Sequence, residues 1–321
     1  MTKINWGVLG TAHIAKTAVI PAMVNARNCR LLAIAGRHLE KVEQFQKMFD
    51  IPKGYQSYDD LLNDPEIQAI YIPLSNDLHK EWTIKALRKK KHVLIEKPMA
   101  VNVEDIMEIF QVARDEGVLV MEAFAYLHSE ITQSLAQTIV DKVIGEVNFM
   151  ESAFFIPNLD ENNFRMSKEK YGGVMYDLGC YNLSLFLRLL GEKPIKVEAT
   201  ANYTPTGIDD YSAAYLEFPS GARASSTCGL GVDPSASRYV IYGTKGKIQG
   251  DYVFNSKGNL SYTITRGEEV KTVTLDVTDN YQLEVEQFGR AIEGAEEIFV
   301  TNEFSYHVAG VMDRVLEKMG Y

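Results

Sequence analysis

The sequence predicts an α/β protein with two parts: a doubly wound parallel sheet, followed by an α+β part with an open, mostly antiparallel sheet. Before about residue 125, short apolar runs alternate with helical patterns. The apolar runs lie at 31–35, 69–72 and 92–95, and the helical patterns lie at 38–49, 77–90 and 103–116. This alternation is typical of β-α-β units and therefore of a parallel sheet.

The pattern changes after residue 125. Helical patterns at 130–142 and 174–190 precede strand-like segments near 195–203, 211–218, 222–229, 237–242 and 260–275. Turns rich in Gly, Asn and Ser separate these segments, which is typical of an antiparallel sheet with helices on one face. Two final helices are expected at about 280–293 and 303–319 and could return to the first domain. We therefore predict domains at 1–124 and 125–321.

Composition excludes several classes of function. A chain of 321 residues exceeds the usual size of a single core, and the net charge of −10 argues against a nucleic-acid partner. No apolar run approaches the roughly 20 residues that span a bilayer, and the first residues lack a secretory pattern, so we expect a cytoplasmic protein without a membrane partner. Cys29, Cys180 and Cys228 lack Cys-x-x-Cys spacing and are expected to be buried free thiols.

The first strand runs into a turn of the dinucleotide-binding type. Three glycines are usual in this turn, and the chain has Gly10, Ala12 and Ala15 in their places. Alanine is accepted at the third place, but at the second it adds a methyl group where the phosphate approaches. A tight turn without a ligand explains this stretch equally well. Polar residues beyond the predicted strand ends favour a nucleotide site, and they are Arg37, Ser75, Asn76, Glu96 and Lys97.

The end of the second strand bears on the type of cofactor. Enzymes that use NAD usually have an acidic residue there, whereas those that use NADP have a cation near the 2′-phosphate. Here Arg37 follows the strand and Lys41 lies close by in sequence. The planar guanidinium can bind a phosphate dianion, although a lone arginine is often only solvated. We predict NADP, with NAD as the alternative.

Four separated segments together resemble the Gfo/Idh/MocA family of NAD(P)-dependent oxidoreductases. They are GVLGTAHIA (7–15), IPLSNDLH (72–79), EKPMA (96–100) and GGVMYDLGCY (172–181). The first and last resemble the branch of dimeric dihydrodiol and xylose dehydrogenases. The resemblance covers nearly the whole chain and implies a Rossmann domain, a C-terminal domain for substrate binding and oligomerisation, and a homodimer. It also implies hydride transfer between the nicotinamide and a sugar, cyclic polyol or dihydrodiol.

The resemblance implies a catalytic set of Lys97, Tyr181 and Asp177. Pro98 restricts Lys97 to extended geometry, and its ammonium group would stabilise negative charge that develops on the substrate oxygen. Tyr181 would be the general acid/base, and a phenol with a pKa near 10 needs a neighbouring cation to act at neutral pH. Asp177, four residues before Tyr181 on one helix face, orients one of them, contacts substrate or only caps the helix. Without the resemblance, Lys97 would be a solvated strand-end lysine and Tyr181 a core aromatic residue.

Cofactor and substrate residues complete the predicted site. The cofactor set is Gly10, Thr11, Ala12, His13, Ile14, Arg37, Leu74, Ser75, Asn76, His79, Glu96 and Lys97. The substrate set is Arg165, Asp177 and Tyr181. Arg165 binds a substrate hydroxyl or carboxylate, or it is an ordinary surface residue. We expect His79 to support the loop on the nicotinamide side, and no Cys, His and acidic cluster predicts a metal.

Departures from the family pattern leave the substrate open. Tyr171 replaces a glycine, Ser184 replaces an aspartate, and no arginine follows Glu122 in the segment AFAYLHSE. A catalytically inactive nucleotide-binding regulator or sensor of the same fold is the alternative to an enzyme, because a fold can keep its cofactor and lose its chemistry. A reductase of another carbonyl or an imine is a third, weaker option.

Overall fold

The computed structural model describes residues 3–251 and 254–321, and the chain divides into two compact units. Unit 1 comprises Met1–Ala100, Glu104–His128 and Thr278–Ser305. Unit 2 comprises Val101–Val103, Ser129–Val277 and Tyr306–Tyr321. The units are therefore not consecutive stretches of sequence. The main crossing, after His128, lies near the boundary expected at 124/125, but Thr278–Ser305 belongs to unit 1.

Unit 1 contains a six-stranded sheet in which every neighbouring pair of strands is parallel. In spatial order the strands are β3 (Lys53–Tyr55), β2 (Cys29–Ala35), β1 (Ile4–Leu9), β4 (Ala69–Ile72), β5 (His92–Glu96) and β6 (Val120–Ala123). The chain builds outward from β1 to β3 and then returns to begin β4 on the other side. This arrangement confirms the predicted doubly wound sheet. It places a topological switch point, the usual ligand site of such sheets, between β1 and β4.

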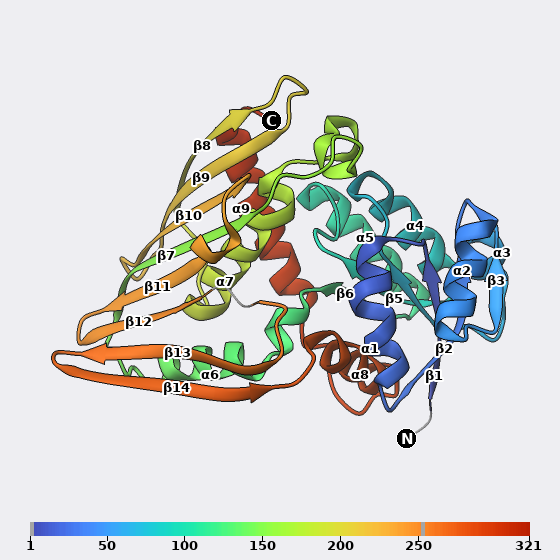
Figure 1. The fold of residues 1–321 in the computed structure, drawn as a ribbon, viewed down its shortest axis with the longest axis horizontal. Coiled ribbons are helices and arrows are strands. Elements are labelled where there is room, and N and C mark those ends of the chain that lie inside the picture. Colours follow the sequence, from blue (N-terminus) through green and yellow to red (C-terminus); the bar gives the residue numbers. More distant parts are fainter. Residues whose placement is uncertain (1–2, 252–253) are drawn as a thin grey trace. The chain divides into compact units, whose positions relative to one another are not determined.

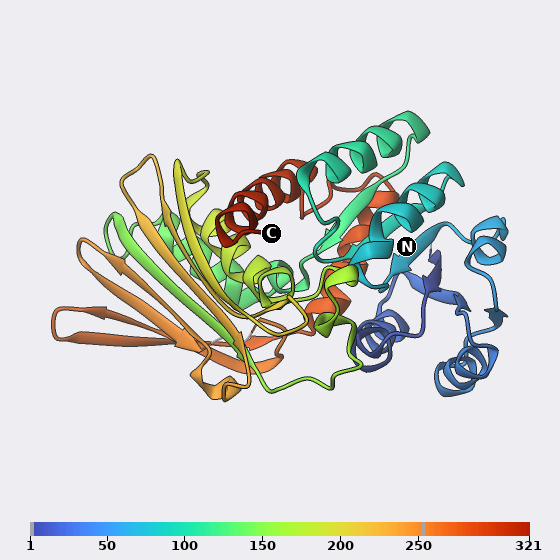
Figure 2. The ribbon, with the colours of Figure 1, turned by 90° about the horizontal axis from the view of Figure 1, so that it is seen from above.

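Helices cover both faces of this sheet, as the blue and teal helices in Figure 2 show. The chain runs from β1 to β3 in one direction and from β4 to β6 in the other. Right-handed crossovers therefore place the helices after β1 and β2 on one face and the helices after β4 and β5 on the other. They are the π-helix η1 (Ala15–Val19), α1 (Ile20–Asn25), α2 (Leu39–Phe49), α3 (Tyr58–Asn63), α4 (Asn76–Arg88), α5 (Val103–Glu116) and the 3₁₀ turn η2 (Ala125–His128). The ranges predicted for α2, α4 and α5 agree within two residues.

Helix α8 (Asn280–Ile292) belongs to unit 1 although it follows the second sheet in the sequence. Its Phe288 packs against Trp6 of β1 with ring centroids 5.8 Å apart, and both side chains are fully buried. Asn28 donates a 2.8 Å hydrogen bond to the carbonyl oxygen of Glu286. These contacts join α8 to β1 and to the turn before β2. Burial of two large aromatic rings explains why this helix packs in unit 1.

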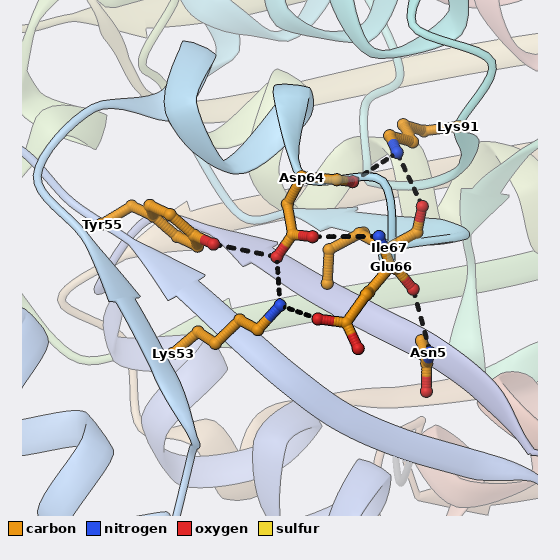
Figure 3. A network of polar contacts seen from close by, with 7 residues as sticks. All are labelled: Asn5, Lys53, Tyr55, Asp64, Glu66, Ile67 and Lys91. Carbon is orange, nitrogen blue, oxygen red and sulfur yellow. Dashed lines mark hydrogen bonds and ion pairs between the residues drawn. The ribbon is translucent and has the colours of Figure 1, made fainter.

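A polar network joins the edge strand β3 to the loop before β4 (Figure 3). The hydroxyl of Tyr55 donates to Oδ2 of Asp64 at 2.8 Å, and Lys53 Nζ lies 2.8 Å from the same oxygen. The backbone N–H of Glu66 donates to Oδ1, and buried Lys91 donates to the Asp64 carbonyl oxygen at 2.8 Å. Burial alone would raise the pKa of Asp64, but Lys53 and the other donors outweigh it and lower that pKa.

We predict that this network stabilises unit 1 only while Asp64 is ionised. Asp64→Asn should lower the free energy of unfolding by about 1.5–3 kcal/mol at neutral pH, since hydrogen bonds to a charged group are lost. Because the folded-state pKa is depressed, the wild-type advantage is present above about pH 4 and disappears as the pH falls through the folded pKa. Denaturant unfolding across this pH range measures the effect. Asp115→Asn, on the exposed surface of α5, is the control, and an equal loss in both variants would contradict the prediction.

Unit 2 contains an eight-stranded sheet, whose strands are labelled in Figure 1. In spatial order the strands are β14 (Glu269–Val277), β13 (Gly258–Arg266), β12 (Gly246–Asp251), β11 (Arg238–Gly243), β7 (Val147–Ile156), β10 (Arg223–Leu230), β9 (Asp209–Glu217) and β8 (Lys196–Tyr203). Only β7 and β10 pair in parallel among these described strands. The sheet is therefore mostly antiparallel, as predicted.

One face of this sheet carries the helices of unit 2. They are α6 (Glu130–Val140), the π-helix η5 (Met175–Gly179), α7 (Cys180–Leu190) and α9 (Asn302–Met319), with 3₁₀ turns η3 (Phe164–Met166), η4 (Lys168–Lys170) and η6 (Pro234–Ala236). Helix α7 packs on β7 and β10, and α6 packs on α7 and β14.

Two features of unit 2 differ from the sequence expectation. The single segment expected at 260–275 is a hairpin of β13 and β14, because Gly267 adopts a φ of 57° and reverses the chain. Strands β7 and β12 were not predicted at all. In β7 the buried residues include Ser152, so apolar and polar side chains do not alternate cleanly along the strand. Cys29, Cys180 and Cys228 are buried, as expected.

Candidate active site

The turn after β1 brings together residues predicted to bind the cofactor. Gly10 has a φ of 125°, and a Cβ atom there would lie 3.0 Å from Cδ2 of Leu74. A Cβ atom on Gly36 would likewise lie 3.1 Å from the methyl group of Thr11. The turn after β1 therefore packs closely against the segments that follow β2 and β4. Only a glycine at position 10 adopts this backbone without strain.

The helix that follows this turn fits a dinucleotide phosphate group. It begins at His13, and the N–H groups of its first turn have no preceding helical carbonyl to bond. Ala15 is fully buried against the sheet, whereas Ala12 is partly exposed at the turn. The small side chain of Ala15 thus permits close packing of the helix on the sheet. The methyl group of Ala12 lies at the partly exposed side of the turn. Such a helix start binds anions through its N–H groups and its dipole.

Arg37 occupies the position expected for a cation that selects NADP. It follows β2 directly, is exposed, and forms a hydrogen bond with Tyr58 of α3. Burial raises the pKa of Tyr58, and the charge and hydrogen bond of Arg37 partly oppose that rise. Tyr58 in turn packs edge-on against Trp82, with centroids 4.8 Å apart. Tyr58, held by Trp82, thus supports the guanidinium group of Arg37. This support was not predicted from the sequence.

Lys97 begins the loop after β5. The strand ends at Glu96, whose Oε1 accepts a 2.6 Å hydrogen bond from the hydroxyl of buried Tyr71. The chain bends at Lys97, and the peptide bond to Pro98 is cis. Two side chains hold this bend. Glu122 of β6 accepts a 2.8 Å hydrogen bond from the N–H of the residue after Pro98, and His79 contacts the carbonyl oxygen of Pro98.

His79 joins the loops after β4 and β5. Its Nδ1 lies 2.8 Å from the carbonyl oxygen of Pro98, and its Nε2 lies 2.9 Å from that of Leu74. The ring is buried, and burial lowers its pKa. Ser75 precedes α4 and Asn76 begins it, so both predicted cofactor residues follow the loop that His79 fixes. Among the described residues, no group of Cys, His and acidic side chains could hold a metal.

Glu122 is a buried titratable group that the sequence analysis did not assign to the site. Burial raises its pKa to about 7, although the N–H of Met99 and the charge of Lys97 favour the ionised form. The carboxyl group therefore stabilises the loop that carries Lys97, and its sequence signal was an acidic residue inside the apolar run of β6.

In unit 2, Arg165 and Asp177 form one structure. Arg165 Nε donates to Asp177 Oδ2 at 2.6 Å, and the Arg165 carbonyl oxygen accepts a 2.8 Å hydrogen bond from Gly173 N–H. Asp177 is the third residue of η5, so it does not occupy the N-cap position. Tyr181 follows four residues later on α7, a spacing close to one turn. The loop thus positions Arg165 against the helix that carries both predicted residues.

A buried carboxyl group, Asp209, fixes the start of this helix. Its Oδ2 accepts a 2.8 Å hydrogen bond from the N–H of Met175, and Ser212 also donates to it. The hydroxyl of Tyr321 donates to Oδ1 at 2.5 Å. Burial raises the pKa of Asp209, and these donors oppose that rise. A Cβ atom on Gly173 would lie only 1.9 Å from Asp209 Oδ1, so the second glycine of the pair leaves room for the carboxyl group.

Asn182 anchors α7 to the sheet beside Tyr181. Its side chain is fully buried, accepts a 2.8 Å hydrogen bond from Ser152 and donates to Ser226 and the carbonyl oxygen of Thr227 at 2.9 and 3.0 Å. Neither Asn182 nor Asp209 was predicted from the sequence. A polar residue inside the apolar run of α7 was the available signal.

The predicted site residues are thus distributed over the two units. Unit 1 holds the cofactor set and Lys97, and unit 2 holds Arg165, Asp177 and Tyr181. A nucleotide-type turn on a doubly wound sheet, with a cation after the second strand, defines the class of dinucleotide-binding oxidoreductase folds. Residues 4–124 match the oxidoreductase family with NAD-binding Rossmann fold, and residues 132–249 match the GFO/IDH/MocA C-terminal domain. The chain belongs to the Gfo/Idh/MocA oxidoreductase family.

Individual relatives support the predicted branch. The chain is 33% identical over 316 residues to D-xylose 1-dehydrogenase (NADP(+)) 2 of Haloferax volcanii, covering 97% of this chain and 96% of that protein. It is 32% identical over 254 residues to trans-1,2-dihydrobenzene-1,2-diol dehydrogenase of Mus musculus, covering 77% and 74%. Its fold matches KijD10, a 3-ketoreductase from Actinomadura kijaniata in complex with NADP and TDP-benzene, with a TM-score of 0.95 and 27% identity over 99% and 98% of the two chains.

We predict that Gly173→Ala disrupts the start of the helix that carries Asp177 and Tyr181. The new methyl group meets the Asp209 carboxyl group, so unfolding experiments should show a loss about 1–3 kcal/mol larger than for Gly221→Ala. Gly221 is a matched control, because it also has a positive φ, 88°, but no atom lies within 4 Å of its added Cβ. Equal losses would show that backbone strain alone, and not the Asp209 contact, requires glycine at position 173.

Proposed function

We propose that the protein is an NADP-dependent oxidoreductase that transfers a hydride between the nicotinamide and a CH–OH or C=O group of a sugar, cyclic polyol or dihydrodiol. The Arg165–Asp177 pair on the helix of Tyr181 is the observation that carries the proposal. Charged groups bonded to each other at a helix start suit hydrogen bonding to several hydroxyl groups of one substrate. Relatives named for NADP(+), xylose and a dihydrodiol support the cofactor and this substrate class.

Each proposed residue has a separate role. The nicotinamide, when bound, supplies or accepts the hydride. Tyr181 donates the proton to the substrate oxygen during reduction and accepts it during oxidation. Lys97 stabilises negative charge on that oxygen and on the phenolate. Asp177, held by Arg165, binds a neighbouring hydroxyl group and orients the reacting carbon.

An enzyme and a nucleotide-binding sensor of the same fold differ in turnover. We expect purified protein to oxidise NADPH or reduce NADP with at least one member of a panel of aldoses, polyols, dihydrodiols and their keto forms. The nicotinamide absorbance measures this directly. Tight NADPH binding without turnover on the whole panel, including imines and other carbonyl compounds, would favour the sensor.

We propose that the protein acts as a homodimer in the cytoplasm. The outer face of the eight-stranded sheet supports an assembly. Side chains alternate along β11, where Tyr239 and Ile241 are buried whereas Arg238 and Tyr242 face outward. These outward residues line an open groove with Lys247 and others of β12 and β13. No helix among the described residues is long and apolar enough to cross a membrane.

Arg37 should decide the preference for NADP over NAD. Arg37→Ala should weaken NADPH binding much more than NADH binding, since only NADPH carries the 2′-phosphate and each charge-assisted hydrogen bond contributes about 1.5–3 kcal/mol. Dissociation constants of both nucleotides measure the effect. Arg30→Ala, an exposed arginine near the other end of β2, is the matched control. Equal losses for the two nucleotides, or a wild-type preference for NADH, would overturn the assignment.

Lys97 and Tyr181 should act together in proton transfer. Lys97→Met deletes the charge, and Tyr181→Phe deletes the hydroxyl. Each should lower kcat on the order of 10²-fold or more, with folding and NADPH binding largely intact. The double variant should lose little more than the worse single variant. Lys97→Met should recover part of its oxidation rate at high pH, where the phenol ionises without a cation, whereas Tyr181→Phe should not.

The kcat values of all four proteins against pH test this pair. Near-normal turnover in both single variants would refute the catalytic assignment. Strictly multiplicative losses would mean that the two residues act independently.

A further inference from the structure

The phenol ring of Tyr181 lies in an aromatic cluster of unit 2. Phe254, from the segment between β12 and β13, stacks on it with centroids 5.3 Å apart and an interplanar angle of 19°. Phe154 of β7 meets it edge-on, with centroids 5.5 Å apart. Tyr181 is 8% exposed, so the cluster covers the ring almost completely. These contacts fix the plane of the ring and therefore the place of its oxygen atom.

The residue after Phe254 reaches that oxygen. Asn255 Nδ2 donates a hydrogen bond to the Tyr181 hydroxyl oxygen at 3.1 Å. Asn255 itself is exposed, so the bond lies at the solvent side of the aromatic cluster. Because Phe254 stacks on Tyr181, it fixes the backbone beside Asn255 and places the Asn255 amide at the phenol oxygen.

A donor at the phenol oxygen has two consequences for proton transfer. It occupies one lone pair, so the hydroxyl hydrogen must point elsewhere and can be donated to another oxygen. It also bonds more strongly to a phenolate than to a phenol, because a hydrogen bond to a charged acceptor is the stronger one. A group that bonds preferentially to the charged form favours ionisation.

We propose that Asn255 is a positioning residue, which directs the hydroxyl proton of Tyr181 and stabilises its phenolate through the Nδ2–H···O hydrogen bond. The inference rests on the role proposed above for Tyr181. In the oxidation direction the phenolate oxygen gains the proton of the substrate hydroxyl, and the carbon loses its hydrogen with the electron pair as a hydride to NADP. In the reduction direction both transfers run backward. Asn255 keeps its own protons throughout.

Two acidic groups of unit 2 lie near the start of the helix that carries Tyr181. Asp177, one turn earlier, disfavours the phenolate, but Arg165 at 2.6 Å neutralises it. Asp209 is buried behind the start of the helix and bonds to donors of its own. The contacts of Asp177 and Asp209 remain in an Asn255 variant. A change in the pKa of Tyr181 in that variant therefore reports on the loss of the amide.

The experiment titrates Tyr181 by the near-ultraviolet absorbance of tyrosinate. The curve of Tyr181→Phe is subtracted from that of wild type, and the same subtraction is made in an Asn255→Ala background. We expect the pKa of Tyr181 to rise by about one unit when the donor is removed, which is a tenfold change in ionisation. Asn255→Asp should raise it further, because a carboxylate repels the phenolate.

Activity gives the second readout. The pH at which oxidation reaches half its maximal kcat should move upward with the titrated pKa, while the dissociation constant of NADPH stays unchanged. Asn259→Ala is the matched control, an exposed asparagine of β13, and should leave both curves in place. An unchanged or lowered Tyr181 pKa in Asn255→Ala would overturn the inference. Full turnover by Tyr181→Phe would instead refute the catalytic role proposed for Tyr181, and the absorbance titration would still test the hydrogen bond.

Discussion

The contact between Gly173 and the buried carboxyl group of Asp209 determines where the helix that carries Asp177 and Tyr181 begins. The carboxyl group bonds to the first N–H of η5, so the π-helix starts at Met175, and only a residue without a side chain fits beside it. Burial of a carboxyl group is costly, and its donors offset that cost only if the surrounding backbone stays in place. The arrangement of the residues proposed to bind substrate depends on this packing.

A similar principle operates in unit 1. Parallel strands end at one edge of the sheet, but they do not by themselves fix the loops that follow. His79 joins two of these loops through carbonyl oxygens, and Glu122 holds the bend after Lys97. The groups that position the proposed catalytic and cofactor residues are thus mostly buried and polar. Each must keep its partners, because an unsatisfied buried polar group costs about 1–3 kcal/mol.

Periodic segments were the part of the fold that could be predicted. Helices α2, α4 and α5 have clear amphipathic spacing, and their bounds agree within two residues. Strand β7 was not predicted because its buried face includes Ser152, which forms a hydrogen bond with Asn182 of α7. Its partner lies 30 residues away in sequence, and no local pattern encodes a hydrogen bond across that separation. Local sequence patterns likewise do not determine that α8 packs in unit 1, because Phe288 contacts Trp6 only in the folded chain.

The sequence by itself determined the fold class, the nucleotide-type turn at Gly10, the cation at Arg37 and the family, because backbone geometry and strand-end chemistry leave short local motifs. It named Lys97, Asp177 and Tyr181 only through the combination of separated segments. Tertiary structure alone decided their surroundings: the pairing of Arg165 with Asp177, the carboxyl group of Asp209 behind Gly173, and the amide of Asn255 at the phenol oxygen. These are contacts between residues distant in sequence, and their energies depend on burial and angle, which arise only when the chain is folded.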